Sequence, residues 1–238
     1  MTADDAPPRV GRVTADEGHD PIYELMRGTP STRSFTDRPV PREVLERVLD
    51  NARFAPSGGN RQGWRVIVVT DRDKRRRMRE LYQEPWERYM RSTGGRDALA
   101  APEASGLPPG RLAMLRGADE YARSFDEVPV HLVVCSLVED LAITDAELDR
   151  PSIVGGASIY PFVHNVLLGL RHEGLGASFT TLLVPAEPAL RELLAIPDEA
   201  AVAGHISVGY REDRWPRKLS RRPVSEFVFS ERFGAPWA

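Results

Sequence analysis

Hydroxyl, amide and guanidinium side chains occur at three separated places in this sequence, in a pattern that can bind an anion. Ser31 stands between Arg27 and Arg33, residues 57–60 are Ser-Gly-Gly-Asn, and a basic cluster occupies positions 217, 218, 221 and 222. An arginine guanidinium is planar and matches a phosphate, while hydroxyls and closely approaching backbone N–H groups complete such a pocket. Taken singly, each group also fits a solvated helix end, an ordinary turn or a solvated strand. Their combination favours a phosphate-bearing ligand.

Other chemistries lack their usual signatures. The chain has no GxxxxGK[ST] loop, no GxSxG elbow, no HExxH motif and no cysteine pair for zinc, so we expect no metal site. His131 and His205 lie in strand-like runs, which is typical of hydrogen-bonded core histidines. Cys135 lies in an apolar run and is expected to be a small buried hydrophobe. Gly174-Leu175-Gly176 precedes a strand, so it indicates a helix stop and not a dinucleotide-binding turn.

The elements that must position these side chains follow from the spacing of apolar residues. Helices are expected from Pro21, which Asp20 can cap, from Pro41 to about Ala52, and over residues 159–170. Compact apolar runs predict the remaining core elements: strands at 66–69, 130–135, 177–181 and 201–210, and a short helix at 189–195.

Two segments depart from this pattern. Residues 79–125 combine polar, helix-like pieces with glycine- and proline-rich interruptions, which predicts an excursion from the core that begins in a helix capped by Asp71. Residues 224–229, Val-Ser-Glu-Phe-Val-Phe, alternate like an exposed strand or a strand added to a partner's sheet.

Composition excludes several classes of protein. The chain has 238 residues, 41% hydrophobic and 28% charged, which is typical of a packed globular protein. We expect one domain over residues 20–238, preceded by a flexible leader over residues 1–19. A net charge of −3 argues against nucleic acid as a partner. No run approaches the roughly 18 apolar residues of a membrane span, and no signal-peptide pattern opens the chain, so a cytoplasmic protein is expected.

Four motifs occur in order along the chain. They are Thr-Pro-Ser-Thr-Arg-Ser-Phe at 29–35 with Arg-Pro-Val-Pro at 38–41, Ala-Pro-Ser-Gly-Gly-Asn-Arg-Gln-Gly-Trp at 55–64, Gly-Leu-Gly at 174–176 and Arg-Arg-Pro-Val at 221–224. In these motifs the sequence resembles the flavin-dependent nitroreductase family, which includes iodotyrosine deiodinase-like proteins. The resemblance implies an α+β, nitroreductase-like fold with a central mixed, mostly antiparallel sheet flanked by helices. It also implies a homodimer that exchanges C-terminal arms.

The resemblance assigns residues to the phosphate of an FMN cofactor at the dimer interface. It implies that Ser31 and Arg33, with Arg221 from the tail, hold this phosphate. The two basic residues that usually precede the serine are replaced here by Thr-Pro at 29–30. We hypothesise that Arg27 supplies the missing charge.

Four further residues are assigned to the rest of the flavin. By resemblance, Ser57 and Asn60 meet the ribityl chain or the ring edge. Thr180 and Thr181 match positions that approach the flavin N5 and pyrimidine edge in the deiodinase branch. The flavin N5 carries the chemistry, tuned by the Thr181 hydroxyl, and no catalytic side chain is expected.

The function implied is an FMN-dependent NAD(P)H oxidoreductase. It would reduce nitroaromatics, quinones or a similar small aromatic acceptor by ping-pong hydride transfer. Residues 79–125 would form a lid over the flavin, and residues 211–238 would wrap the partner. Trp86 and Tyr89 either stack on an aromatic substrate or only anchor the lid helix.

Three alternatives stay open at this point. A reductive dehalogenase and a biosynthetic dehydrogenase share the same implied fold. A flavin-binding protein without turnover belongs to another class. Semiquantitative comparison of NAD(P)H consumption across acceptors would separate the enzymes from the binding protein.

Overall fold

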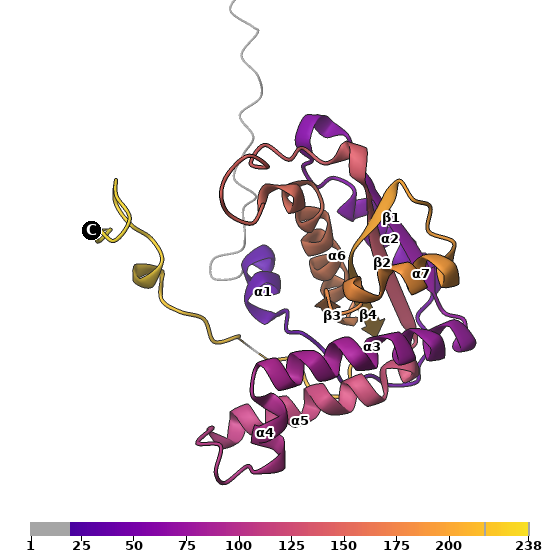
Figure 1. Cartoon of the computed structure of the whole chain (residues 1–238), viewed down its shortest axis with the longest axis vertical. Coiled ribbons are helices and arrows are strands. Elements are labelled where there is room, and N and C mark those ends of the chain that lie inside the picture. Colours follow the sequence, from indigo (N-terminus) through magenta and orange to yellow (C-terminus); the bar gives the residue numbers. More distant parts are fainter. Residues whose placement is uncertain (1–19, 217, 238) are drawn as a thin grey trace, which may run out of the picture. The chain divides into compact units, whose positions relative to one another are not determined.

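The structure, a computed structural model, describes residues 20–216 and 218–237. These residues form two units, one of residues 29–215 and a smaller one of residues 20–28 and 216–237 (Figure 1). The leader expected at residues 1–19, and Arg217 of the basic cluster, lie outside the described residues. In the part of the chain that is described, no helix combines the length and apolar character needed to cross a membrane.

The larger unit is built on a four-stranded sheet. In spatial order the strands are β1 (Trp64–Val69), β2 (Val130–Leu137), β4 (Ala200–Gly209) and β3 (Gly176–Thr180). All four coincide with predicted strands, because each is a compact run of apolar and β-branched residues. Every pair is antiparallel. The four strands therefore differ from the expected mixed sheet, since among the described residues parallel pairing is limited to an isolated bridge between Ser31 and Ala177.

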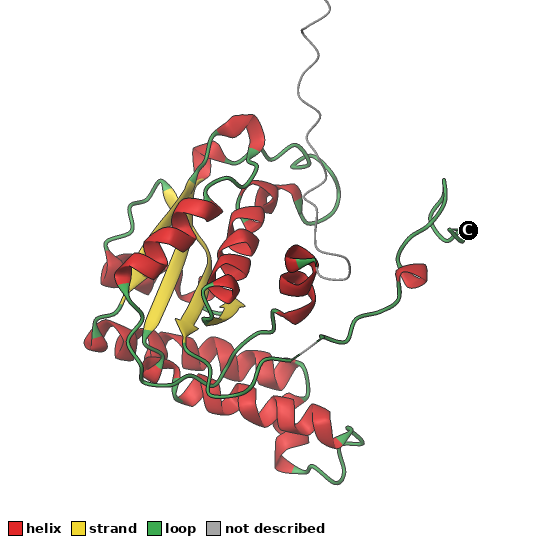
Figure 2. Cartoon of the chain, turned by 180° about the vertical axis from the view of Figure 1, so that it is seen from behind, coloured by secondary structure: helices red, strands yellow, loops and turns green. Residues whose placement is uncertain are grey.

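One face of the sheet is covered by two predicted helices, α2 (Arg42–Ala52) and α6 (Tyr160–His172). Their apolar stripes pack into one core cluster with the sheet residues Leu132 and Val134. α6 ends as predicted at Gly174, whose φ of 77° is the left-handed conformation that favours glycine. Figure 2 shows both helices beside the yellow strands.

The opposite face is covered by α3 (Arg72–Ser92), α5 (Pro109–Arg123) and α7 (Glu187–Leu194), with α4 (Gly95–Ala100) joining α3 to α5. The Asp71 cap is confirmed, because its Oδ1 accepts a hydrogen bond from the backbone N–H of Lys74 at 2.9 Å. The helices α3, α4 and α5 contain the predicted excursion of residues 79–125. The expectation that it leaves the core is wrong in part, because Met90 and Phe125 are fully buried in the second core cluster.

The smaller unit contains α1 (Pro21–Gly28) and the C-terminal tail. Asp20 caps α1 as predicted, with its Oδ1 accepting from the N–H of Ile22 at 3.1 Å. The backbone N–H of Leu219 donates to the carbonyl of Arg27 at 2.8 Å and ties the tail to the helix. The strand expected at residues 224–229 is not formed in the single chain, where Val224–Glu226 is a 3₁₀ turn, since an isolated strand has no edge to pair with.

Candidate active site

A cavity of about 400 Å³ lies between the end of β3 and the helices α3 and α5. Three of the sequence-predicted cofactor residues line it: Arg33, Thr180 and Thr181. The rest of its wall is mostly aromatic, formed by Tyr82, Trp86, Tyr89, Tyr121 and Phe179. A concave, largely apolar pocket with a few convergent polar groups is the usual form of a small-molecule site.

Arg33 reaches the cavity because its segment runs beside β3. The backbone N–H of Thr32 donates to the carbonyl of Ala177 at 2.7 Å, and Ser31 forms a parallel bridge to the same residue. Ser31 and Arg33 both line an adjoining groove of about 590 Å³. Arg33 borders both the groove and the cavity, so this residue lies where the two adjoin.

Arg211 is a cation of this groove that the sequence reasoning missed. Its Nη1 donates to Thr32 Oγ1 at 2.9 Å. A Cβ at Gly176 would lie 2.6 Å from the Arg211 Cγ, so the absence of a side chain at Gly176 lets the Arg211 side chain pack against β3. The sequence signal that could have identified Arg211 was its position just after the last predicted core strand. Arg211 itself pairs with residue 35 through an isolated bridge.

The groove as a whole is not a cationic surface. Its lining includes two arginines and four carboxylates, the latter being Glu120, Glu127, Glu212 and Asp213. An anion is therefore favoured only where guanidinium groups and hydroxyls gather, at the end of the groove bordered by Ser31 and Arg33.

The aromatic wall comes from one face of α3. Tyr82, Trp86 and Tyr89 recur at i, i+4 and i+7, and this spacing was the signal for a common face. The Trp86 ring lies 6.3 Å from that of Tyr82 and 5.8 Å from that of Tyr89, measured between ring centroids. Tyr82 is 2% exposed and Tyr89 is 46% exposed, so the stripe runs from the core to the rim of the cavity.

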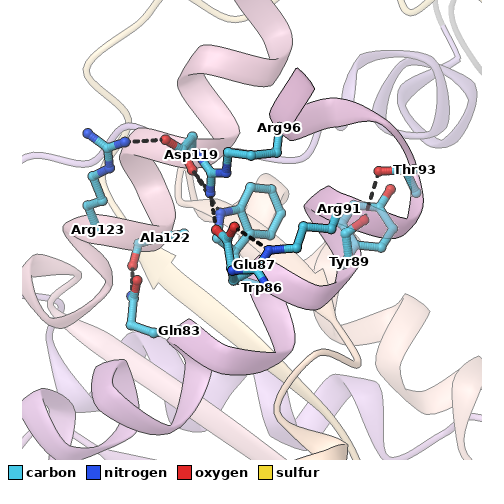
Figure 3. A network of polar contacts seen from close by, with 10 residues as sticks. All are labelled: Gln83, Trp86, Glu87, Tyr89, Arg91, Thr93, Arg96, Asp119, Ala122 and Arg123. Carbon is cyan, nitrogen blue, oxygen red and sulfur yellow. Dashed lines mark hydrogen bonds and ion pairs between the residues drawn. The ribbon is translucent and has the colours of Figure 1, made fainter. Parts of the chain in front are cut away.

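Trp86 is held in place by the buried carboxylate of Asp119 (Figure 3). The indole Nε1 donates to Asp119 Oδ1 at 3.0 Å. The same carboxylate accepts an ion pair from Arg96 at 3.0 Å and one from Arg123 at 2.6 Å. Although burial opposes its charge, the hydrogen bonds from Trp86 and Arg96 hold the pKa of Asp119 below its ordinary value. The carboxylate therefore joins α3, α4 and α5 behind the cavity wall.

Two tyrosine hydroxyls connect the helices to the sheet. The Tyr82 hydroxyl shares the cavity with Thr180 of β3, whose hydroxyl favours the phenolate form of Tyr82. Burial raises the pKa of Tyr82 to about 12, while the Thr180 hydroxyl and the charge of Arg33 oppose this rise. The Tyr121 hydroxyl lies 2.6 Å from Ser207 Oγ of β4. The sequence analysis predicted neither contact, because two residues that are far apart in the chain produce no local spacing pattern when they pair.

The two core histidines form a neutral pair. His131 Nε2 lies 3.0 Å from the carbonyl of Phe125, so this nitrogen carries the proton, and His131 Nδ1 accepts from His205 Nε2 at 2.7 Å. Burial lowers the pKa of both histidines, that of His205 to about 3. Both are fully buried, which confirms the expectation of core histidines. Cys135 is likewise buried, and burial raises its pKa to about 11.

Two other predicted site residues, Ser57 and Asn60, are not brought to the cavity. Ser57 and Asn60 belong to a turn around Gly58–Asn60, where Ser57 Oγ accepts from the N–H of Gln62 at 3.0 Å. Neither is among the described residues that line the cavity or the groove. Arg27 and Arg221 belong to the smaller unit, so their place in a site stays a prediction. Over residues 20–216 and 218–237, no cluster of three or more His, Cys, Asp or Glu side chains could hold a metal ion.

Comparison with known proteins places this arrangement in context. The family model described as "Nitroreductase family" matches residues 26–210. The chain is 31% identical to a 4-nitrobenzoate reductase of Nocardioides sp. (strain LMS-CY), over 86% of this chain and 87% of the relative. Two solved structures share the fold, each with a TM-score of 0.61 and 22% identity. One is an FMN and NADPH-dependent nitroreductase from Sphigopyxis sp. strain HMH, covering 90% of this chain and 100% of its own. The other is an iodotyrosine deiodinase bound to FMN and 3-iodo-L-tyrosine, covering 89% and 98%.

Proposed function

Because the chain belongs to the nitroreductase family and is an oxidoreductase of that family, we propose that it is an FMN-dependent NAD(P)H oxidoreductase acting on nitroaromatics, quinones or a similar small acceptor. The observation that carries this proposal is the cavity in which Arg33, Thr180 and Thr181 share one space with an aromatic wall. Such a space offers a charged group for an anion, hydroxyls for a polar ring edge and flat surfaces for stacking.

The residues present fit FMN. A flavin needs a slot for a planar ring, hydrogen-bonding groups at its polar edge and a cation for its phosphate. The cavity supplies the first two through its aromatic wall and the two threonine hydroxyls, and Arg33 supplies the third beside the Ser31 hydroxyl. Bound FMN would supply the hydride-transfer chemistry, while the protein binds and orients it and excludes water.

The charge on the phosphate needs more than one cation. Arg211 borders the same groove as Ser31 and Arg33, which supports it as the second guanidinium. Arg27 and Arg221 remain our proposals from the sequence motif. Each charge-assisted hydrogen bond contributes roughly 1.5 to 3 kcal/mol, so the phosphate ligands set much of the cofactor affinity.

A homodimer would account for the two predicted residues that lie outside the cavity. Ser57 and Asn60 belong to the most specific motif of the sequence, yet they do not line the cavity of their own chain. We propose that in a homodimer they meet the flavin held by Arg33 and Thr180 of the other copy. The acceptor would stack on Trp86 and Tyr89, which together form the outer part of the aromatic wall.

The test is direct. The purified protein should be yellow or take up added FMN, and should oxidise NAD(P)H when 4-nitrobenzoate, a nitrofuran or a quinone is supplied. Halide release from a halogenated phenol under the same conditions would favour the dehalogenase alternative. A colourless protein that binds no FMN, or a flavoprotein that oxidises no NAD(P)H with any acceptor, would contradict the proposal.

A further inference from the structure

Reduction of a nitro group consumes protons as well as electrons, and the cavity holds few groups that can provide them. Its described lining contains no carboxyl, imidazole, thiol or amine. The ionisable groups are Arg33, which stays charged, and the phenols of Tyr82, Tyr89 and Tyr121. A proton donor among the cavity side chains is therefore one of three tyrosines.

The surroundings of the three phenols differ. The Tyr121 hydroxyl is engaged by Ser207 Oγ at 2.6 Å within the core, and Tyr89 is 46% exposed at the rim. Tyr82 is 2% exposed and lines the cavity together with Thr180, one of the two threonines assigned to the flavin edge. By position, Tyr82 is thus the buried phenol nearest to where an acceptor would meet the flavin.

A backbone contact of Thr180 bears on how the Thr180 and Tyr82 hydroxyls are oriented. Thr180 Oγ1 accepts from the backbone N–H of Leu182 at 3.2 Å. The Thr180 hydroxyl hydrogen therefore points away from Leu182, and donation of this hydrogen toward the Tyr82 oxygen favours the tyrosinate. The Tyr82 hydroxyl hydrogen is then available to a ligand in the cavity.

We propose that Tyr82 donates a proton to the electron acceptor in this cavity, an inference that rests on the proposed nitroreductase activity. NAD(P)H supplies a hydride equivalent and is oxidised to NAD(P)⁺, and the nitro group takes up the two electrons. The Tyr82 O–H bond breaks as an O–H bond forms on a nitro oxygen. The N–O bond then breaks, and this oxygen leaves as water with the hydride hydrogen as its second hydrogen.

The proton balance closes through solvent. The tyrosinate left behind takes a proton from water before the next turnover. Nitroarene, NAD(P)H and one proton thus give nitrosoarene, NAD(P)⁺ and water. No reductant other than the nucleotide of the proposed activity is needed.

The groups that face Tyr82 suit this role. Thr180 of β3 and Arg33 of the neighbouring segment both favour the tyrosinate, whereas burial and Tyr89 of α3 oppose it. Tyr121 of α5 meets Tyr82 edge-on, with ring centroids 6.3 Å apart. The balance keeps the phenol protonated at neutral pH, and it releases the proton only to a strongly basic oxygen such as that of a nitro group receiving electrons.

The first test compares two acceptors in Tyr82→Phe. Ferricyanide takes single electrons without a proton, whereas a nitroaromatic needs one. We expect kcat with 4-nitrobenzoate to fall about a hundredfold, with loss of the solvent deuterium isotope effect, and the ferricyanide rate to change by less than about threefold. Equal nitro rates and isotope effects in the two proteins would overturn the proposal. Absence of nitro reduction in the wild-type protein would instead reject the proposed function.

The second test measures binding without turnover. Benzoate has the shape of nitrobenzene and carries negative charge on its two oxygens, as a nitro group does on reduction. The Tyr82→Phe holoprotein should bind benzoate about tenfold more weakly, because it lacks the phenol donor. Tyr160→Phe, which removes the same atom from a tyrosine that lines neither the cavity nor the groove, should change this affinity by less than about threefold. Unchanged benzoate affinity in Tyr82→Phe would overturn the proposal.

A third variant covers the case in which Tyr82→Phe does not fold. Thr180→Val is nearly isosteric and removes the hydroxyl that supports the tyrosinate. With FMN at a saturating concentration, the ratio of the nitro rate to the ferricyanide rate should then fall. An equal loss with both acceptors would overturn the proposal.

Discussion

Arg33 is placed so that one side chain can serve two parts of a ligand. It borders the aromatic cavity on one side and the groove with Ser31 on the other. A ligand with a flat ring and a phosphate at the end of a flexible chain would meet its guanidinium at the junction. The position explains why an arginine in a surface segment matters to a site formed mainly by α3, α5 and β3.

We predict that Arg33→Ala raises the Kd for FMN by about ten- to a hundredfold, since it removes a charge-assisted hydrogen bond of roughly 1.5 to 3 kcal/mol. Titration of the apoprotein with FMN, followed by quenching of flavin fluorescence, gives this value. Arg33→Lys should recover part of the loss, because lysine keeps the charge and loses the planar fork. An unchanged Kd in Arg33→Ala would show that the phosphate binds elsewhere.

The second cation can be identified by the same titration. If Arg211 supplies it, Arg211→Ala weakens FMN binding about tenfold or more, and Arg27→Ala has less than about a threefold effect. The structure favours this order because Arg211 borders the groove with Ser31. The reverse order would support the sequence hypothesis that Arg27 replaces the basic pair absent at residues 29–30.

Asp119 gives a prediction about pH. Its pKa is lowered from the ordinary 3.8 in the folded protein, so the carboxylate stabilises the fold above pH 3.8 and this contribution is lost as the pH falls through the lowered pKa. Asp119→Asn keeps an acceptor for Trp86 and loses the charge that pairs with Arg96 and Arg123. We expect a loss of about 1 to 3 kcal/mol in the free energy of unfolding.

Urea unfolding checks this prediction across pH. The difference between wild type and Asp119→Asn should stay constant from pH 7 to pH 5 and shrink only below about pH 3.8. A difference that has already vanished at pH 5 would mean that burial, which opposes the charge, outweighs the hydrogen bonds and raises the pKa.

At the scale of elements, two glycines in helices predict opposite changes in stability. In α6, a Cβ at Gly169 would lie 3.1 Å from Val48 Cγ1 of α2, so the close packing of these helices depends on the glycine. Gly169→Ala should lower the free energy of unfolding by about 1 to 3 kcal/mol. In α5, a Cβ at Gly117 would meet nothing within 4 Å, and Gly117→Ala should raise it by about 0.5 to 1 kcal/mol. Thermal unfolding measures both, and a destabilised Gly117→Ala would contradict the argument.

The elements that local spacing could predict were predicted. All four strands, α2, α6 and the caps at Asp20 and Asp71 follow from apolar periodicity and short-range hydrogen bonding. Residues 224–229 form no strand within the single chain, because alternation describes what a strand could bury but not whether an edge is available to pair with. Their addition to a partner's sheet stays a prediction. The sheet differs from the expected mixed one because the resemblance carried a general topology that the four strands of this chain do not follow.

The candidate site was only partly predictable for a similar reason. Arg33 lies in a motif, Thr180 and Thr181 match positions of the deiodinase branch, and all three line one cavity. Tyr82, Asp119 and Arg211 matter through partners 33 to 179 residues away in the sequence, so no local pattern could reveal them. Contacts between α3, α5 and the sheet depend on tertiary packing. Sequence periodicity indicates which face of a helix is buried, but not which residues that face contacts.

At the scale of the whole molecule, the predicted site is divided. Arg33 and Thr180 line the cavity, whereas Ser57 and Asn60 lie in a turn that does not contribute to it. Either the turn has a purely structural role, or a second copy of the chain brings it to the cofactor. The two possibilities differ in whether a flavin site is built within one chain or across two.

Mixing two inactive variants distinguishes these possibilities. If each site combines Arg33 of one copy with Asn60 of the other, a mixed dimer of Arg33→Ala and Asn60→Ala contains one site with both defects and one intact site. Unfolding and refolding the two variants together should then restore high-affinity FMN binding to about one site per mixed dimer, whereas each variant treated alone should show none. If the site lies within one chain, every site in the mixture keeps one defect and nothing is recovered. Fluorescence titration of the refolded mixture, set beside each variant refolded separately, would therefore tell a shared site from a self-contained one.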